Sequence, residues 1–363
     1  MNLSIRTASF ADRLLSWQQH SGRHDLPWQR DRRDAYRVWL SEVMLQQTQV
    51  ATVLGYYERF LHRWPDVTAL AAADLDDVLA AWSGLGYYSR ARNLHRCAAV
   101  VAGEFGGQFP SEAAALAKLP GIGASTAAAI ASICFGQRAA ILDGNVKRVL
   151  MRHQAIDADP AASATLRQLQ ALADSLLPPA GPAMPVYTQA IMDLGATLCT
   201  PRQPQCERCP VAGDCAGRAS GDPVRFPPRR VRPPKARAQR EHWWLWLQQG
   251  DRVWLEQRPA QGVWAGLWTL PLHDSEAACL AQVEGSVRGS AGSDVEHLPS
   301  IRHVLTHFDW LLHPVRVRGA GHPGRLIAAE AGETEPGRWF TLTEAWELAL
   351  PAPLRKLLFA SVS

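Results

Sequence analysis

Apolar residues between residues 9 and 216 recur every three or four positions, the spacing of one face of an α-helix. Residues 35–44 and 48–60 show this pattern. The alanine-rich runs 113–119 and 126–133 combine high helix propensity with small side chains that let helices pack closely. Few segments alternate as a strand does. The pattern predicts an all-α domain over residues 1–219.

The pattern changes near residue 239. Residues 241–259 contain two strand-like runs on either side of Gly250 and Asp251, a dipeptide typical of a hairpin turn. Residues 310–317 also resemble a strand, whereas 343–350 and 353–359 have helical spacing. A separate α+β domain is therefore expected over residues 239–363, and no repeat of fixed period is present.

Residues 220–238 separate the two patterns. Four prolines (Pro227, Pro228, Pro233 and Pro234) exclude a continuous helix there, and the basic side chains between Arg229 and Arg240 repel one another. We interpret this segment as an interdomain linker. A solvated spacer and a contact with nucleic-acid phosphates are both compatible with its composition.

Composition limits the class of protein. A chain of 363 residues that is 47% hydrophobic can bury a large core, and its length fits about two domains. The net charge of +4 and a pI near 8.7 allow a polyanionic partner without requiring one. Arg6, Asp12 and Arg13 interrupt the apolar residues of the N-terminus, and no stretch is long enough to span a bilayer. We expect a cytoplasmic protein with no membrane partner.

Four of the seven cysteines are close together in the sequence. Cys199, Cys206, Cys209 and Cys215 have the spacing C-x6-C-x2-C-x5-C, which lets one loop direct four sulfurs at one centre. Four thiolates suit zinc or an iron-sulfur cluster, and the residues alone leave the metal open. The remaining cysteines, Cys97, Cys134 and Cys279, lie in apolar helical contexts and are interpreted as core residues.

Two short motifs could bind an anion or perform chemistry. Residues 119–123, Leu-Pro-Gly-Ile-Gly, lie between two helical runs, so that the second helix would begin with exposed backbone N–H groups suited to a phosphate. A plain turn explains the same pattern. Asp143 precedes Gly144 where another helix should start, and a helix cap is the ordinary role of such a residue.

The hairpin, Asp143 and the four-cysteine loop together resemble the helix-hairpin-helix DNA glycosylase superfamily over residues 9–216. The resemblance implies a two-lobed α-helical fold with an active-site cleft between the lobes. It also implies a 4Fe-4S cluster on the four cysteines, which anchors a DNA-facing loop at residues 200–205. In that family the DNA backbone would be contacted by residues matching Gly121, Ile122, Gly123, Ser125 and Arg202.

Two positions indicate the branch of this superfamily. Ser125 stands where endonuclease III-like enzymes carry a Schiff-base lysine, and a hydroxyl cannot form an imine, so no strong lyase step is expected. Residues 38–53, which contain Glu42, resemble the signature of the MutY adenine glycosylases. Residues 84–93 and 26–28 also resemble parts of that family. Without the resemblance, Glu42 would be interpreted as a solvated helix carboxylate.

The resemblance assigns a role to each carboxyl group. Glu42 would protonate adenine at N7 and then activate water, and burial should raise its pKa. Asp143 would stay ionised and stabilise positive charge on the sugar, as expected for an oxocarbenium-like transition state. Lys147 matches a lysine that can trap the abasic product, although Asn145 and Lys147 could only shape the site.

Cleavage requires the target nucleotide to leave the base stack. The resemblance implies that four residues wedge the helix and contact the opposite base, and that four others line the adenine pocket. Each is otherwise an ordinary surface or core residue. The first set is Gln47, Thr48, Leu85 and Tyr87, and the second is Trp28, Gln29, Val50 and Gln189.

Residues 258–271 resemble the start of the MutY C-terminal domain, which has a Nudix-like fold. The following segment offers Glu276 and Glu284 but no REUXEE core, so pyrophosphate hydrolysis is not expected. In the family a loop of this domain recognises 8-oxoguanine. The matching residues are Thr306 and His307, with Leu305 replacing an aromatic residue; a plain loop at a strand end is the alternative.

The sequence therefore predicts a monofunctional glycosylase that removes adenine opposite 8-oxoguanine or G. It would act on double-stranded DNA as a monomer, associated with the nucleoid and working with downstream repair proteins. A bifunctional endonuclease III-like enzyme is the closest alternative, disfavoured by Ser125 and Glu42. A non-catalytic DNA-binding module that senses redox state is the alternative from another class.

Overall fold

The computed structural model describes residues 8–31, 33–228, 237–287, 294–319 and 337–359, with the side chains of 283–287 excepted. Contacts divide the chain into two units. One comprises Met1–Ala72 and Asn93–Arg232, and the other comprises Ala73–Arg92 and Pro233–Ser363. The pattern of apolar residues did not predict that residues 73–92 belong to the same unit as the C-terminal residues. Among the described residues, no helix has both the length and the apolar composition needed to cross a membrane.

The described part of the first unit is helical and contains no strand, which confirms the predicted all-α fold. Short 3-10 or π turns occur at Pro27–Gln29, Leu194–Leu198, Cys206–Arg208, Ala212–Asp214 and Pro223–Arg225. The α-helices are α1 (Phe10–Ser21), α2 (Ala35–Leu45), α3 (Val50–Arg63), α4 (Val67–Ala71), α7 (Ala113–Leu116), α8 (Ala124–Phe135), α9 (Gly144–His153), α10 (Ser163–Ser175), α11 (Ala183–Asp193), α12 (Ala216–Ala219) and most of α6 (Ser89–Glu104).

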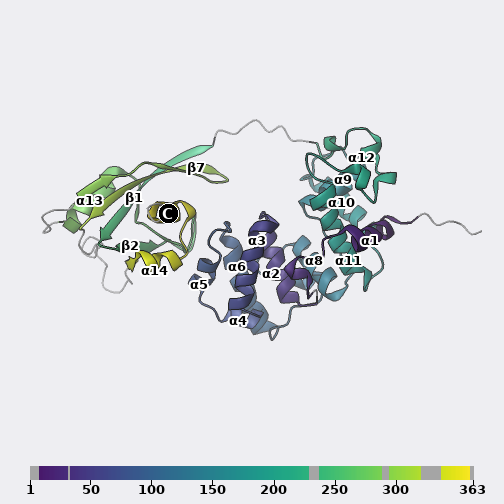
Figure 1. Ribbon diagram of the computed structural model, residues 1–363, viewed down its shortest axis with the longest axis horizontal. Helices are drawn as coiled ribbons and strands as arrows, with labels where there is room; N and C mark the ends of the chain where they lie inside the picture. The colour runs from purple at the N-terminus through teal and green to yellow at the C-terminus, as the bar shows by residue number, and fades with distance from the viewer. Residues whose placement is uncertain (1–7, 32, 229–236, 288–293, 320–336, 360–363) are drawn as a thin grey trace, which may run out of the picture. The chain divides into compact units, whose positions relative to one another are not determined.

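Helix α8 lies at the centre of this unit. It packs against α2 on one side and α11 on the other, and α11 in turn packs against α1. Figure 1 shows α2, α3 and α4 in one group of helices and α1, α9, α10, α11 and α12 in another, with α8 between them. Alanines such as Ala127 and Ala131 fill the buried face of α8, so that neighbouring helices approach closely.

Two helices of the first unit differ from their predicted bounds. The run expected over 113–119 is helical only to Leu116, because the N–H groups of Lys118 and Leu119 bond carbonyls three residues back and tighten the chain into the hairpin. Gly121 has φ +75°, and a Cβ there would lie 2.6 Å from Asn93 Cβ, so the hairpin requires glycine. The helix expected from Thr48 begins at Val50, since Gln47 has φ +55°.

The described part of the second unit contains an eight-stranded mixed sheet with the path order β3-β2-β1-β7-β5. Strands β1 and β7 are parallel and every other pair is antiparallel. Its elements are β1 (Ala238–Gln249), β2 (Arg252–Gln257), β3 (Trp268–Thr269), β4 (Leu272–His273), β5 (Asp294–His297), β6 (Ile301–Val304), β7 (Phe308–Arg318), β8 (Gly337–Thr341), α13 (Glu276–Val287), α14 (Leu342–Glu347), α15 (Ala352–Phe359) and α5 (Leu75–Ala81). The predicted hairpin, the strand over 310–317 and the helix over 353–359 are thereby confirmed, whereas the helix expected over 343–350 ends at Glu347.

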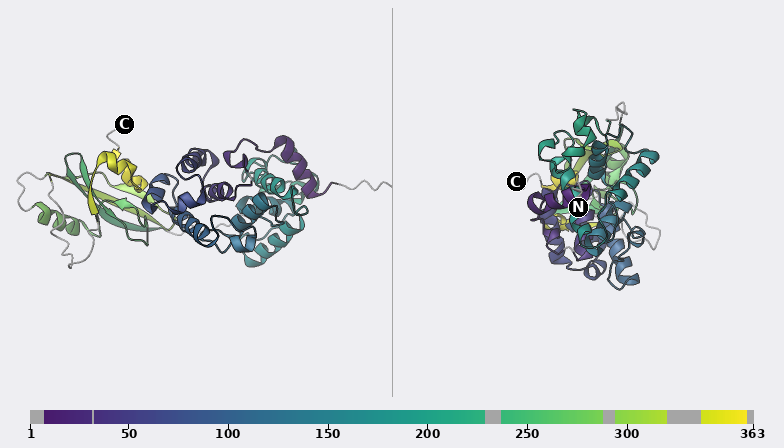
Figure 2. Two further views of the ribbon diagram at one scale, coloured as in Figure 1. Left: turned by 90° about the horizontal axis from the view of Figure 1, so that it is seen from below. Right: turned by 90° about the vertical axis from the view of Figure 1, so that its right-hand side faces the viewer.

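Alternate residues of β1 face opposite sides of this sheet. Trp244 joins a core cluster with Leu354 of α15, whereas Leu245 joins a second cluster with Cys279 of α13. This follows from the two-residue period of a strand. Helices therefore cover both faces, as Figure 2 shows for α13 and the yellow C-terminal helices.

Candidate functional site

Glu42 lies in the middle of α2, which is buried on most of its surface. Asp34 caps this helix by accepting a hydrogen bond from the backbone N–H of Arg37. Residues on both sides of Glu42, including Ser41 and Val43, are buried, so the helix carries the carboxyl group into the protein interior. There Glu42 lines a cavity of about 460 Å³, a volume that includes open solvent at its mouth.

The four residues expected to line an adenine pocket all line this cavity. Trp28 and Gln29 come from the turn before α2, Val50 from the start of α3 and Gln189 from α11. Sequence reasoning assigned no pocket role to the other lining residues. Four of them lie within the stretches that resemble the MutY signature (Leu26, Val38, Ser41 and Leu45), and three lie outside any motif (Arg23, Ile133 and Met192). Helices distant in sequence thus converge on Glu42.

The cavity contains hydrogen-bonding groups without partners in the described part of the chain, beside an aromatic ring. Both amide atoms of Gln29 are buried and have no hydrogen-bond partner among the described residues. A buried amide without partners costs free energy unless a ligand or water satisfies it. Trp28 is held edge-on against Tyr57, with ring centroids 5.4 Å apart. The cavity therefore combines an aromatic wall with unsatisfied hydrogen-bonding groups.

Glu42 is suited to act as an acid at neutral pH. Burial raises its pKa to about 7, and the negative charge of Asp143 contributes in the same direction. A carboxyl group with this pKa retains a proton in a large fraction of molecules near neutrality. The alternative of a solvated helix carboxylate is therefore wrong.

Asp143 is the N-cap of α9, as the sequence suggested. Its Oδ1 accepts a hydrogen bond of 2.7 Å from the backbone N–H of Val146. Asp143 is half-buried and is not among the residues that line the cavity of Glu42. Its charge nevertheless affects the pKa of Glu42, so the two carboxyl groups lie within electrostatic reach. The capping role and a role in chemistry are thus compatible.

The hairpin joins the segment that carries Asp143. Ser125, in the first turn of α8, accepts a hydrogen bond of 3.2 Å through its Oγ from the backbone N–H of Leu142. Ser125 and Lys147 line a second cavity, separate from that of Glu42. Within the hairpin Ile122 is buried, whereas Gly121 and Gly123 are exposed. Contact of these residues and Arg202, which is also exposed, with a DNA backbone stays a prediction.

The residues expected to wedge the helix differ in accessibility. Gln47 is exposed and Thr48 half-buried in the turn that precedes α3. In the second unit, Tyr87 is 53% exposed with φ +49°, whereas Leu85 is buried. Tyr87 is thus accessible to a ligand whereas Leu85 is covered, and contact of these residues with DNA stays a prediction.

Thr306 and His307 form the exposed tip between β6 and β7. The turn is closed by a hydrogen bond of 3.0 Å from the N–H of Leu305 to the carbonyl of Phe308. Leu305 itself packs against the core of the second unit. The aromatic-to-leucine replacement therefore fills the interior rather than the surface, and the two polar residues are the ones presented outward.

The four clustered cysteines line one cavity of about 330 Å³, again counting open solvent. Within the described ranges, no three His, Cys, Asp or Glu side chains are arranged to hold a single metal ion. A zinc ion would require sulfurs converging at about 2.3 Å from one point. The four cysteines surround one space, and four thiols are the ligand set of an iron-sulfur cluster.

Cationic side chains hold this segment in place. The buried guanidinium of Arg152 donates hydrogen bonds to the carbonyls of Thr200 (2.6 Å), Pro201 (2.9 Å) and Phe226 (2.9 Å), and its Nη1 lies 3.4 Å from Cys199 Sγ. The positive charge of Arg152 beside Cys199 suits an anionic cluster.

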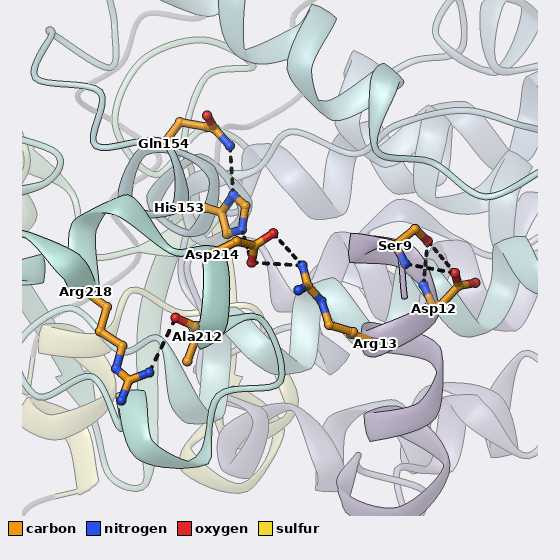
Figure 3. Close-up of polar contacts among 8 residues, drawn as sticks. All are labelled: Ser9, Asp12, Arg13, His153, Gln154, Ala212, Asp214 and Arg218. Atoms are coloured by element: carbon orange, nitrogen blue, oxygen red, sulfur yellow. Dashed lines mark hydrogen bonds and ion pairs between the residues drawn. The ribbon is translucent and has the colours of Figure 1, made fainter. Parts of the chain in front are cut away.

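A second anchor involves the residue before Cys215. Figure 3 shows Asp214 between His153 and Arg13. Arg13 donates bonds of 2.9 and 2.7 Å to the two carboxylate oxygens of Asp214, and His153 Nε2 lies 3.2 Å from Oδ1. Helices α1 and α9 are thus tied to the cysteine segment.

The remaining cysteines follow the prediction with one exception. Cys97 and Cys279 are buried, as expected. Cys134 is only half-buried, and burial raises the pKa of its thiol to about 12, with contributions from the charges of Asp34 and Glu42. It lies near the end of α8, where the helix leaves the core, so it is not an ordinary core residue.

Comparisons with known proteins agree with this arrangement. Residues 40–174 match the HhH-GPD superfamily of base excision DNA repair proteins, residues 199–215 the iron-sulfur binding domain of endonuclease III, and residues 242–360 the NUDIX domain. These matches confirm the expected folds and the 4Fe-4S site.

Relatives match over nearly the whole chain. The chain is 32% identical to the adenine DNA glycosylase of Buchnera aphidicola (subsp. Schizaphis graminum), over 96% of this chain and 97% of that protein. It is 36% identical to the human adenine DNA glycosylase, over 96% of this chain and 73% of that protein. A thermostable thymine-DNA glycosylase structure superposes with a TM-score of 0.53 at 28% identity, over 58% of this chain and 95% of that chain. Because identity above 30% extends across both domains, the chain belongs to the adenine DNA glycosylase family.

Proposed function

We propose that the protein removes adenine paired with 8-oxoguanine, and adenine paired with G, by acid-assisted hydrolysis of the N-glycosidic bond. The observation that carries this proposal is Glu42, a half-buried carboxyl group with a pKa of about 7 in a cavity lined by Trp28, Gln29, Val50 and Gln189. A planar base extruded from the duplex would find there an aromatic wall and a proton donor.

Protonation is the step that such a base requires. Adenine leaves poorly as an anion, so a proton delivered to its N7 by the Glu42 carboxyl lets it leave as a neutral base. The C1′–N9 bond breaks as its electron pair moves to the base, and positive charge develops on the sugar. The Glu42 carboxylate left behind can then accept a proton from the incoming water, which supplies the new C1′–O bond.

Asp143 would stabilise the charge that develops on the sugar. Its position at the N-cap of α9 fixes the carboxylate through the bond to the N–H of Val146, and its charge already acts on Glu42. Because a fixed carboxylate needs no reorganisation when charge appears, it lowers the barrier electrostatically. Ser125 provides no amine for an imine, so the reaction would end at the abasic site.

The opposite base would be read by exposed groups. Thr306 and His307 at the tip of the β6–β7 turn offer hydrogen-bonding side chains, and Tyr87 offers an exposed ring. We assign recognition of 8-oxoguanine to the first pair. One protein chain acting on one duplex is sufficient for this scheme.

Single-turnover excision on defined duplexes tests the proposal. The protein should release free adenine from A:8-oxoguanine and A:G duplexes and leave an intact abasic strand. Glu42→Gln should bind the A:8-oxoguanine duplex and release no adenine. Release of oxidised pyrimidines with strand cleavage would support the endonuclease III alternative. Binding without release of any base would support a non-catalytic module.

A further inference from the structure

A buried ion pair borders the cavity of Glu42. Asp193, the last residue of α11, is fully buried. Its Oδ1 accepts bonds of 2.6 and 2.8 Å from Nη2 and Nε of Arg23, and its Oδ2 accepts one of 3.0 Å from the Arg23 backbone N–H. Arg23 lines the cavity, whereas Asp193 does not. The guanidinium compensates the buried negative charge.

Two glutamines supply the other donors around Asp193. Gln18 Nε2 lies 3.1 Å from Oδ2, and Gln189 Nε2 lies 2.9 Å from Oδ1. Gln189 precedes Asp193 by four residues, so both side chains lie on the same face of α11. Sequence reasoning assigned Gln189 to the pocket without noticing this partner one turn later.

This contact determines which way the Gln189 amide is turned. A carboxylate paired with a guanidinium only accepts hydrogen bonds, so Gln189 must direct its NH2 group at Asp193. Rotation of the amide by half a turn would place its carbonyl against a carboxylate oxygen, which is repulsive. The carbonyl Oε1 is then the group that Gln189, a cavity-lining residue, has left for a ligand.

An independent observation indicates that the cavity takes a polar ligand. Gln29 lines the same cavity and is only 8% exposed. Neither of its amide atoms has a hydrogen-bond partner in the described part of the chain. Such a group needs a hydrogen-bonding ligand or water. The cavity is therefore built for a molecule with both donors and acceptors.

We propose that Asp193 is a positioning residue that selects the base to be removed, an inference that rests on the proposed function. By holding the NH2 group of Gln189, it keeps the Gln189 carbonyl facing the bound base. A carbonyl accepts a hydrogen bond from an amino group at C6 of a purine and repels a carbonyl at that position. Adenine can accept a proton from Glu42 at N7 and donate a hydrogen bond from its 6-amino group to the Gln189 carbonyl. Hypoxanthine can accept the proton at N7, but its 6-carbonyl cannot donate to Gln189.

The test compares two bases within each protein. Single-turnover rates are measured on duplexes that carry adenine or hypoxanthine opposite the same 8-oxoguanine, for wild type, Asp193→Asn, Gln189→Met and the double variant. The intrinsic labilities of the two bases are the same for every protein, so they cancel when the ratio of a variant is divided by the ratio of wild type. In Asp193→Asn the Gln189 amide can turn either way, so the adenine-to-hypoxanthine ratio should fall about tenfold.

The double variant separates positioning from a structural role. If Asp193 acts through Gln189, the double variant should have the same adenine-to-hypoxanthine ratio as Gln189→Met alone. A merely structural role would slow the removal of both bases equally and leave the ratio at its wild-type value, which would overturn the proposal. A further fall of the ratio in the double variant would also overturn it.

Two further variants complete the experiment. Gln18→Met removes another donor to the same carboxylate without touching the cavity, and its ratio should stay within about twofold of wild type. If Asp193→Asn does not fold, Gln189→Met serves as the test, because it leaves the Asp193–Arg23 pair in place. An adenine-to-hypoxanthine ratio in Gln189→Met equal to that of wild type overturns the proposal. Failure of wild type to release adenine would instead refute the proposed function.

Discussion

The negative charge of Asp143 acts on Glu42, adding to the effect of burial and helping to raise the pKa of the Glu42 carboxyl to about 7. The two residues belong to different helices, since Glu42 lies within α2 and Asp143 caps α9. One carboxylate therefore helps its neighbour to keep a proton. In the proposed mechanism, this coupling lets Glu42 act as the acid while Asp143 supplies negative charge beside the sugar.

The first prediction concerns the pH dependence of excision. If Glu42 is the acid, the rate depends on its protonated form and should fall as pH rises through about 7. Single-turnover rates between about pH 5.5 and 9, measured on an A:8-oxoguanine duplex at saturating protein, provide the profile. A rate that rises to a plateau above neutrality would contradict the assignment. Binding of an uncleavable duplex, measured at each pH, controls for weaker DNA association.

The second prediction concerns stability. The pKa of Glu42 in the folded protein, about 7, exceeds the ordinary value of 4.5, so the folded state binds the proton more tightly than the unfolded state does. The contribution to stability is complete below the ordinary value and is lost as pH rises through about 7. Glu42→Gln, which cannot ionise, should therefore be more stable than wild type above neutrality, by at most roughly 3 kcal/mol.

Chemical denaturation of both proteins at several pH values measures this difference. It should shrink as pH falls and vanish near the ordinary pKa of a glutamic acid. A constant difference at all pH values would indicate a packing effect rather than titration. Glu58 is exposed on α3, and Glu58→Gln provides a matched control that replaces a carboxyl group outside the cavity.

The third prediction separates the two roles of Asp143. Asparagine caps helices about as well as aspartate, so Asp143→Asn should retain the bond to the Val146 N–H and keep the melting temperature near that of wild type. Loss of the negative charge should slow excision by about 100-fold or more. Asp143→Ala loses both and should also be destabilised by about 1 kcal/mol. Normal turnover by Asp143→Asn, with weakened DNA binding, would refute an electrostatic role.

Local sequence patterns predicted the features that depend on nearby residues, namely the metal site, a helix cap and a hairpin. The spacing of Cys199, Cys206, Cys209 and Cys215 indicated one metal site because a short loop can direct all four inward. Asp143 before a helical run indicated a cap, and Gly250 a hairpin, because both depend on the backbone within a few residues. Resemblance to a family, rather than periodicity, identified Glu42.

Features that depend on tertiary packing could not be derived in this way. The bond between Asp193 and Arg23 joins residues 170 positions apart, and no local pattern distinguishes Asp193 from a solvated aspartate. Leu305 looked like a lost stacking residue until the sheet showed that it packs into the core. Cys134 looked buried because its helix is apolar, but it lies near the end of α8, where the carboxyl groups of Asp34 and Glu42 influence it.

The fourth prediction concerns the cysteine segment. Cys209→Ser should lose bound iron and the visible absorbance of an iron-sulfur cluster, because one of four thiolates is removed. Cys279→Ala is the matched control, since Cys279 is buried in the second unit and should leave the iron content unchanged. Metal analysis and absorbance of the purified proteins measure both. A colourless wild-type protein with one zinc per chain would exclude the cluster.

The fifth prediction concerns the exposed turn between β6 and β7. Thr306→Val keeps the shape of the side chain but removes the hydroxyl that would hydrogen-bond 8-oxoguanine, so the preference for A:8-oxoguanine over A:G should fall by about fivefold. The rate on A:G should change little, because the catalytic residues are untouched. Val304→Ala, at an exposed position of β6 just before the turn, should leave the preference unchanged. If Thr306→Val slows both duplexes equally, the turn contributes to DNA binding in general and does not read the oxidised base.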